Sequence, residues 1–116
     1  MSGWIGVDLD RTLATYTHWR GEDHIGDPIM PMVERIKRWL SLGIEVSIFT
    51  ARWADKENRE RFSKILHNWL RERCDLPALK ITNKKDYGTI EIWDDIAVGL
   101  HPNTGEYRLG PTGRNH

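Results

Sequence analysis

The feature that most constrains this chain is the stretch from Trp4 to Tyr16, WIGVDLDRTLATY, in which a short apolar run ends in two acids separated by one leucine. The apolar run has the length and composition of a buried strand. Side chains two residues apart on a strand point to the same face, so Asp8 and Asp10 would stand about 6 to 7 Å apart. Two carboxylates at that distance repel by roughly 2.5 kcal/mol at an effective dielectric constant of about 20. The stretch therefore predicts a proton, a cation or a bound ligand at the end of this strand.

The length of the chain, 116 residues, suits one domain with one core. We expect that domain over residues 1–102, with residues 13–30 as a small flap, because this excursion is too long for an ordinary connection between a strand and a helix. Gly, Pro and polar residues prevail after His101. Residues 103–116 are therefore predicted to form an extended or mobile tail.

Charge and cysteine content narrow the functional class. The 17 basic and 17 acidic residues cancel, so no net field favours a long nucleic-acid footprint or a membrane surface. The single cysteine, Cys74, cannot form an internal disulfide, and the N-terminal apolar run is shorter than a signal peptide or a membrane span. A cytoplasmic protein without a membrane partner is the expectation.

Hydrophobic periodicity predicts an α/β fold. Two helices are expected, over residues 31–42 and 56–73, because apolar residues recur there at helical spacing. Strands are expected at 4–8, 44–50, 78–82 and 89–93, with a fifth candidate at 96–100. Strands that alternate with helices imply right-handed crossovers. The prediction is a three-layer, Rossmann-like, mainly parallel sheet with helices on both faces.

Polar residues follow the end of each expected strand. The first strand leads into Asp8, Asp10 and Thr12, the second into Thr50 and Arg52, the third into Lys84 and Lys85, and the fourth into Asp94 and Asp95. Parallel α/β sheets bind ligands at the carboxyl ends of their strands. Clustered carboxylates suit Mg²⁺, and a lysine with a hydroxyl group suits phosphoryl oxygens. The pattern predicts a magnesium-assisted phosphate site.

The same residues resemble the four motifs of the haloacid dehalogenase (HAD) superfamily of phosphohydrolases. DLDRT matches the first motif, DxDxT, and SIFT matches a strand that ends in Ser or Thr. A lysine and an acidic pair, here in IWDD, complete the set in the family's order over residues 4–95. The chain is most similar to small members of bacteria and phages that have almost no cap.

This resemblance implies a role for each motif residue. Asp8 is the expected nucleophile that forms an aspartyl phosphate, and Asp10 the expected general acid and base. Thr50 and a lysine hold the phosphate, with Lys85 favoured over Lys84 because it directly precedes Asp86. Thr12 fixes the turn through a hydrogen bond to the backbone. The expected Mg²⁺ ligands are Asp8, the backbone carbonyl of Asp10, Asp94 and Asp95, and which of the last pair binds directly stays open.

The chain departs from the family pattern at three places. Arg11 stands where many members have glycine, and Gly99 stands where a further acid often follows the fourth motif. No last helix is evident after that motif. These departures concern the residues around the metal ligands more than the class of reaction that the resemblance implies.

The flap and the segment after Thr50 carry the substrate clues. The flap contains Tyr16, His18 and Trp19, and Arg52 and Trp53 follow Thr50. Aromatic rings and arginines beside a phosphate site could stack a base and hold a phosphate, so a nucleotide or a nucleic-acid 3′-phosphate end is a candidate substrate beside other small phosphomonoesters. Capless members of the family also use a partner subunit as a lid, which makes a homo-oligomer a further candidate.

Two alternative functions stay open. A receiver-like signalling domain also combines early acids, a hydroxyl residue and a lysine on a parallel sheet, but it needs a phosphate-accepting aspartate at the end of a middle strand, where this chain has Thr50. A HAD-shaped binding protein with little turnover is the second alternative. The intact pair of Asp8 and Asp10 favours an enzyme over both.

Overall fold

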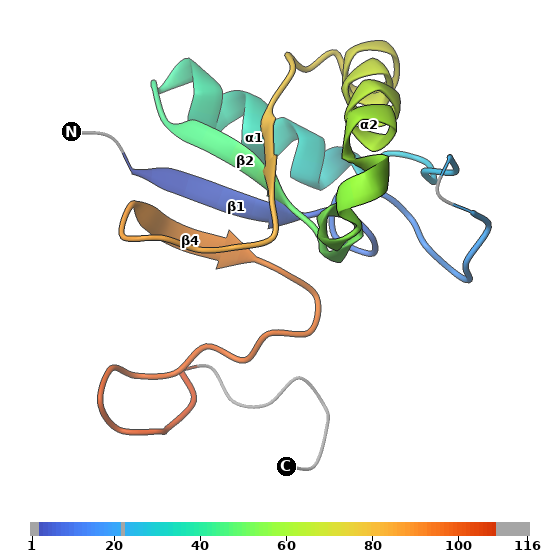
Figure 1. Cartoon of the computed structure of the whole chain (residues 1–116). Helices are drawn as coiled ribbons and strands as arrows, with labels where there is room; N and C mark the ends of the chain where they lie inside the picture. Colours follow the sequence, from blue (N-terminus) through green and yellow to red (C-terminus); the bar gives the residue numbers. More distant parts are fainter. Residues whose placement is uncertain (1–2, 22, 109–116) are drawn as a thin grey trace.

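The computed structural model describes residues 3–21 and 23–108 (Figure 1). The sheet strands are β1 (Trp4–Asp8), β2 (Glu45–Phe49), β3 (Lys80–Thr82) and β4 (Thr89–Trp93). The helices are α1 (Met30–Ser41) and α2 (Arg59–Cys74), and two short 3₁₀ turns, η1 (Ala51–Ala54) and η2 (Lys56–Asn58), lead into α2. Both expected helices and four of the expected strands are thus confirmed, with β3 shorter than predicted.

The four strands form one all-parallel sheet in the order β3-β2-β1-β4. Ile5 and Val7 of β1 pair in register with Val46 and Ile48 of β2. These four apolar side chains therefore share one face of the sheet, where all are buried. The prediction of a mainly parallel α/β sheet is confirmed.

One hydrophobic core joins this face of the sheet to both helices. The helices contribute the buried apolar side chains of their inner stripes. Those from α1 are Met32, Val33 and Ile36, and those from α2 are Phe62, Leu66, Trp69, Leu70 and Cys74. Trp39 of α1 also packs against Trp93 of β4, with ring centroids 5.2 Å apart. The helices therefore fix β1, β2 and β4 against one another.

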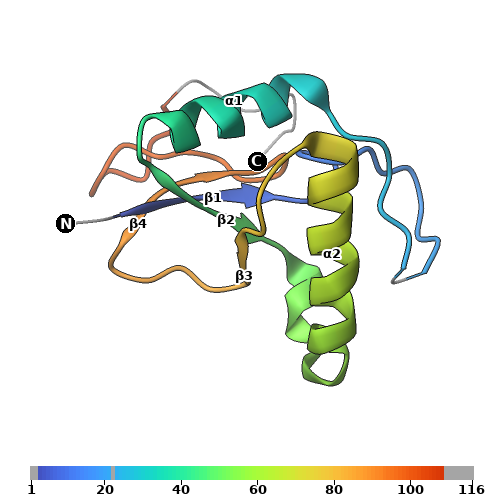
Figure 2. The same ribbon diagram turned by 90° about the horizontal axis from the view of Figure 1, so that it is seen from above.

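The prediction of helices on both faces of the sheet is wrong for the described residues. Figure 1 shows α1 and α2 on the same side of β1 and β4, and Figure 2, from above, shows the two helices running in roughly perpendicular directions. The steps from β1 to β2 and from β2 to β3 run in the same direction across the sheet. Two right-handed crossovers in one direction place their helices on one face. The return from β3 to β4, which would cover the other face, is the helix-free loop 83–88.

The opposite face of the sheet is lined by a few large side chains and this loop. Trp4, Phe49 and Ile92 surround Gly6 on that face, where a Cβ would lie only 3.0 to 3.3 Å from their side chains. The loop is attached where Trp4 Nε1 donates to Asp86 Oδ1 over 2.9 Å. This thin cover takes the place of a third layer.

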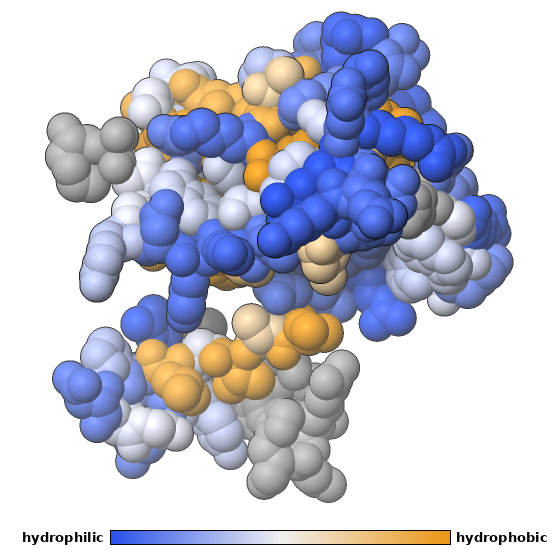
Figure 3. All heavy atoms as spheres, in the orientation of Figure 1, coloured by the Kyte–Doolittle hydropathy of each residue, from blue (hydrophilic) through white to orange (hydrophobic). Residues whose placement is uncertain are grey.

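The fifth expected strand, 96–100, is also wrong. The backbone N–H of Ile96 bonds to Asp94 Oδ1 over 3.3 Å, in a turn that takes the chain away from the edge of β4. Residues 99–108 then turn back on themselves, joined by a single bridge between Leu100 and Tyr107. Figure 3 shows apolar atoms exposed on the chain after β4, and the large exposed hydrophobic residues of 96–108 are Ile96, Leu100 and Tyr107. The rest of the expected tail, 109–116, lies outside the described residues.

The flap is held at its base. Ala14 bridges both Asp10 and Pro28, and Trp69 Nε1 of α2 donates to the carbonyl of Gly26 over 3.1 Å. A Cβ at Gly26 would lie 2.0 Å from the carbonyl oxygen of Thr15, so only glycine fits there. Trp19 and His24 of the flap lie beside η1, where both contact Arg52. No helix in the described part of the chain combines the length and apolar character needed to cross a membrane.

Candidate functional site

The site lies where the direction of the chain across the sheet reverses. Connections from β1 proceed through β2 to β3, whereas β4 lies on the other side of β1. Open parallel sheets form a crevice at such a switch point, outside the carboxyl ends of the strands. Asp8 ends β1, and Asp94 and Asp95 directly follow β4. The topology therefore brings segments more than 80 residues apart in sequence to one edge.

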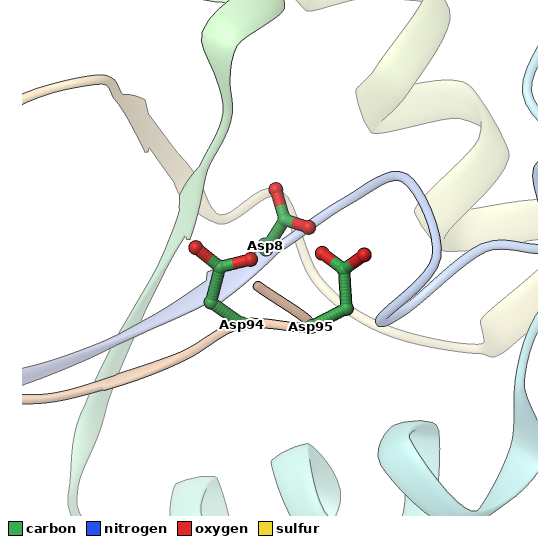
Figure 4. A group of neighbouring side chains, drawn as sticks. All are labelled: Asp8, Asp94 and Asp95. Atoms are coloured by element: carbon green, nitrogen blue, oxygen red, sulfur yellow. The ribbon is translucent and has the colours of Figure 1, made fainter. Parts of the chain in front are cut away.

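Asp8, Asp94 and Asp95 form the acidic cluster of the site (Figure 4). One carboxylate oxygen from each lies within 4.8 Å of the others. Burial first, and then the charge of Asp94, raise the pKa of Asp8 to about 7, although the Thr12 hydroxyl, which donates to Asp8 Oδ2 over 3.2 Å, opposes the rise. Burial and the neighbouring Asp95 likewise raise the pKa of Asp94. Three carboxylates this close favour retained protons or a bound cation, and an all-oxygen donor set could hold Mg²⁺.

The Asp10 side chain lies outside this cluster and binds Arg52. Arg52 Nε donates to Asp10 Oδ2 over 2.9 Å and Nη2 donates to Oδ1 over 2.7 Å, a bidentate pair. The side chains are only 10% and 25% exposed. Arg52 Nη1 also donates to the His24 carbonyl over 2.9 Å, and the guanidinium lies over the Trp19 ring at 5.1 Å. Arg52 therefore orients Asp10 and ties the flap to η1, and its expected contact with a substrate phosphate stays a prediction.

The two threonines take different places. Thr50 is 2% exposed, and its hydroxyl oxygen accepts the backbone N–H of Arg52 over 3.2 Å. The hydroxyl also carries one hydrogen that it can donate, and Thr50 directly follows the carboxyl end of β2. Thr12 bonds to the Asp8 carboxylate rather than to the backbone, so its expected turn-fixing contact is replaced by one to the proposed nucleophile.

The lysines lie in the loop 83–88. Lys84 lines a hollow of about 340 Å³ on the helix-free face together with Trp4 and Glu45, which begin β1 and β2. Lys85 is exposed. Within residues 3–21 and 23–108, neither lysine forms an ion pair with the acidic cluster. The choice between Lys84 and Lys85 as the phosphate-binding lysine stays a prediction.

Arg11 has a backbone conformation that explains why glycine suits its position. Its φ is 73°, in the left-handed region that β-carbon-bearing residues rarely occupy. The turn needs this φ because the Leu9 carbonyl accepts the amides of Thr12, Leu13 and Ala14. The guanidinium lies 5.5 Å from the centroid of the Tyr16 ring. Arg11 is thus held in a strained turn next to the acids.

We expect Arg11→Gly to be more stable than Arg11→Ala by about 1 kcal/mol, because both lose the ring contact but only glycine relieves the left-handed strain. Urea denaturation of the two variants measures the difference. The same pair of substitutions at the exposed helical position Lys64 is the control, where alanine should be favoured by about 1 kcal/mol. Equal stability of the two Arg11 variants would contradict the strain.

Comparison with family models, with curated proteins and with solved structures found no match to this chain. The fold and the site define the class on their own: an α/β protein with a four-stranded all-parallel sheet and an acidic cluster at its switch point. The function is therefore argued from the chemistry of these residues.

Proposed function

We propose that this protein is a Mg²⁺-dependent phosphatase that hydrolyses a phosphomonoester through an aspartyl phosphate, with a minimal HAD-like fold whose cap is the flap. The observation that carries the proposal is the acidic cluster, in which carboxylate oxygens from the ends of β1 and β4 lie within 4.8 Å. Asp10 stands two residues after Asp8, as the first motif requires. A reducing, cytoplasmic setting suits the buried thiol of Cys74, whose pKa burial raises to about 11.

Asp8, Asp94 and Asp95 would hold the Mg²⁺, which when bound neutralises the cluster and the phosphoryl oxygens. An ionised Asp8 oxygen attacks phosphorus, and the bond from phosphorus to the leaving oxygen breaks as Asp10 gives that oxygen a proton. Asp10 then takes a proton from water, whose oxygen attacks phosphorus and releases Asp8. The Thr50 hydroxyl and a lysine of the loop 83–88 bind phosphoryl oxygens in both steps.

Arg52 gives this scheme a positioning residue. A bidentate guanidinium fixes the plane of the Asp10 carboxyl group, and two oxygens then have defined directions. The same contact is the observation that favours the second candidate, a HAD-shaped binding protein with little turnover, because it occupies Asp10. The receiver-like alternative gains no support, since β2 ends at Phe49 and is followed by Thr50.

Phosphate release from 4-nitrophenyl phosphate, measured with Mg²⁺ and with a chelator, tests the proposal. We expect release that falls by at least about 10²-fold on chelation, because a divalent ion supplies several kcal/mol of charge stabilisation, and that returns when Mg²⁺ is added back. Asp94→Asn and Asp95→Asn should raise the Mg²⁺ concentration needed for half-maximal rate, and the larger effect identifies the direct ligand. Asp75→Asn, at the exposed C-terminal end of α2 and outside the acidic cluster, is the matched control.

Other outcomes of this assay discriminate between the candidates. Release that a chelator leaves unchanged would contradict the metal site. Stable phosphorylation by acetyl phosphate without release would support the receiver-like domain. Mg²⁺ binding without either reaction would support the binding protein.

A further inference from the structure

A cavity of about 200 Å³ adjoins the ion pair between Arg52 and Asp10. It lies between the flap and the segment that leads into α2. Its walls are mainly apolar, from Trp19, Ala51, Ala54 and Phe62. Arg52, Asp55 and Asn58 add polar groups at its boundary. The cavity therefore combines an aromatic surface with hydrogen-bonding groups, which is the usual composition of a small-ligand site.

The size of the cavity limits its occupant. Pockets that bury drug-sized ligands measure about 300 to 1,000 Å³. A cavity of about 200 Å³ therefore accommodates one ring system rather than a whole nucleotide or a long chain. The remainder of any larger ligand has to extend out of the cavity.

The aromatic walls suit a flat ligand. Trp19 is 54% exposed although it is a large aromatic residue, and the Arg52 guanidinium lies over its ring at 5.1 Å. On the other wall, Phe62 is buried and packs against Trp53 with centroids 6.4 Å apart, while Arg59 stacks on Trp53 and donates to its carbonyl. The inner wall is thus rigid before any ligand binds, and Trp19 offers a ring at the mouth.

Polar groups at the boundary match the edge of a nucleobase. Asp55 Oδ2 accepts a hydrogen bond from Asn58 Nδ2 over 2.7 Å, which fixes the carboxylate. A carboxylate accepts from the ring N–H and amino groups of bases, as it does in nucleic-acid recognition. Flat aromatic ligands without such donors would leave Asp55 unused.

The cavity is placed to receive the leaving group of the proposed reaction. Arg52 lines the cavity and also binds both carboxylate oxygens of Asp10, the proposed proton donor to the leaving oxygen. The part of a substrate that departs with that proton therefore lies next to the cavity. We propose that the cavity binds the nucleobase of a nucleoside monophosphate. The assignment of the phosphate end rests on the proposed function, whereas the assignment of the base does not.

Binding of nucleosides, which carry no phosphate, tests the base site separately from catalysis. Adenosine, guanosine, cytidine and uridine are titrated into the full chain in the presence of a chelator, and binding is followed by calorimetry or NMR. We expect saturable binding of at least one nucleoside and none of ribose. Trp19→Ala should weaken it about 5- to 150-fold, which corresponds to one base stacked on an aromatic ring. Trp19→Phe should restore most of the affinity, and Tyr107→Ala, at an exposed aromatic residue of the turn 99–108, should leave it unchanged.

A kinetic measurement gives the second readout. The ratio of kcat/KM for the bound nucleoside's 5′-monophosphate to that for ribose 5-phosphate should exceed tenfold and should fall in Trp19→Ala. Phosphatase activity without any nucleoside binding at millimolar concentration would overturn the base site and leave the proposed function intact. Nucleoside binding without phosphatase activity would support the base site and overturn the function. A preference for a 3′-phosphorylated oligonucleotide over every mononucleotide would overturn the mononucleotide as substrate.

Discussion

Asp8→Asn is expected to abolish phosphate release, with a loss of at least about 10³-fold, and at the same time to stabilise the metal-free protein at pH 8. The catalytic loss follows because an amide cannot act as the nucleophile that forms the aspartyl phosphate. The gain in stability follows from the acidic cluster, because Asp8 lies beside Asp94 and Asp95 and is partly buried. Asp8→Asn therefore measures separately the electrostatic destabilisation that the acidic cluster causes and the catalytic activity that it provides.

The gain in stability depends on pH in a direction that the pKa fixes. Folding raises the pKa of Asp8 from 3.8 to about 7 in the absence of metal. Between these values the folded protein keeps a proton that the unfolded chain has released, so the free energy of unfolding falls as pH rises from about 4 to about 7. This destabilisation of the folded protein is complete above pH 7 and absent below pH 4. A shift of three units corresponds to about 4 kcal/mol, which water reduces at a half-exposed group, so we expect a gain of about 1 to 2 kcal/mol.

Urea denaturation of the wild-type protein and Asp8→Asn in a chelator, at pH 8 and at pH 4.5, measures this gain. The variant should be more stable at pH 8 and nearly equal to the wild type at pH 4.5. Asp86→Asn is the control of opposite sign: the hydrogen bond from Trp4 lowers the pKa of Asp86, so its carboxylate stabilises the folded protein at both pH values and the variant should be less stable than the wild type at both. Mg²⁺ should stabilise the wild type more than Asp8→Asn. An Asp8→Asn variant that is less stable than the wild type at pH 8 would contradict the electrostatic cost.

Local sequence patterns predicted the elements of the fold but not how the layers are arranged. The apolar spacing of Val33 and Ile36, and of Leu66 and Leu70, is enough to define α1 and α2. Which face each helix covers depends instead on the direction of each crossover, and no local pattern encodes the order β3-β2-β1-β4. The apolar run 96–100 failed as a strand because the turn at Asp94 takes the chain away from the outer edge of β4, the edge strand next to it in sequence.

The candidate site, too, could be predicted from the sequence only in part. Asp8, Asp94 and Asp95 could be grouped in advance because parallel strands end at one edge of a sheet. The pairing of Arg52 with Asp10, 42 residues apart, depends on how η1 packs against the flap, which no local pattern encodes. In the sequence, this contact was indicated only by the aromatic and basic residues of the flap. In the structure, the Arg52 guanidinium lies over the ring of one of them, Trp19.

Asp10→Asn is expected to slow hydrolysis of an alkyl phosphate by about 10² to 10⁴-fold but hydrolysis of 4-nitrophenyl phosphate by less than about tenfold in the first step. An alkoxide leaves only with a proton, whereas 4-nitrophenolate is a stable anion that needs little help. The second step also loses its base, so the aspartyl phosphate should accumulate. Rapid-quench measurement of 4-nitrophenolate should therefore show a burst followed by a slow steady state.

Because Asp10 pairs with Arg52, Asp10→Asn should also lower the free energy of unfolding, and this loss can be traced to Arg52. The guanidinium is 10% exposed, and an amide at position 10 offers it one acceptor where the carboxylate offers two. We expect Asp10→Asn to lose about 1 to 3 kcal/mol of stability, the cost of a buried charged donor without its acceptor. Arg52→Ala in the Asp10→Asn background should then cost less than Arg52→Ala alone, which a double-mutant cycle measures. Additive stability effects would show that the pair does not interact, and equal rate losses with alkyl and aryl phosphates would show that Asp10 acts in positioning rather than in proton transfer.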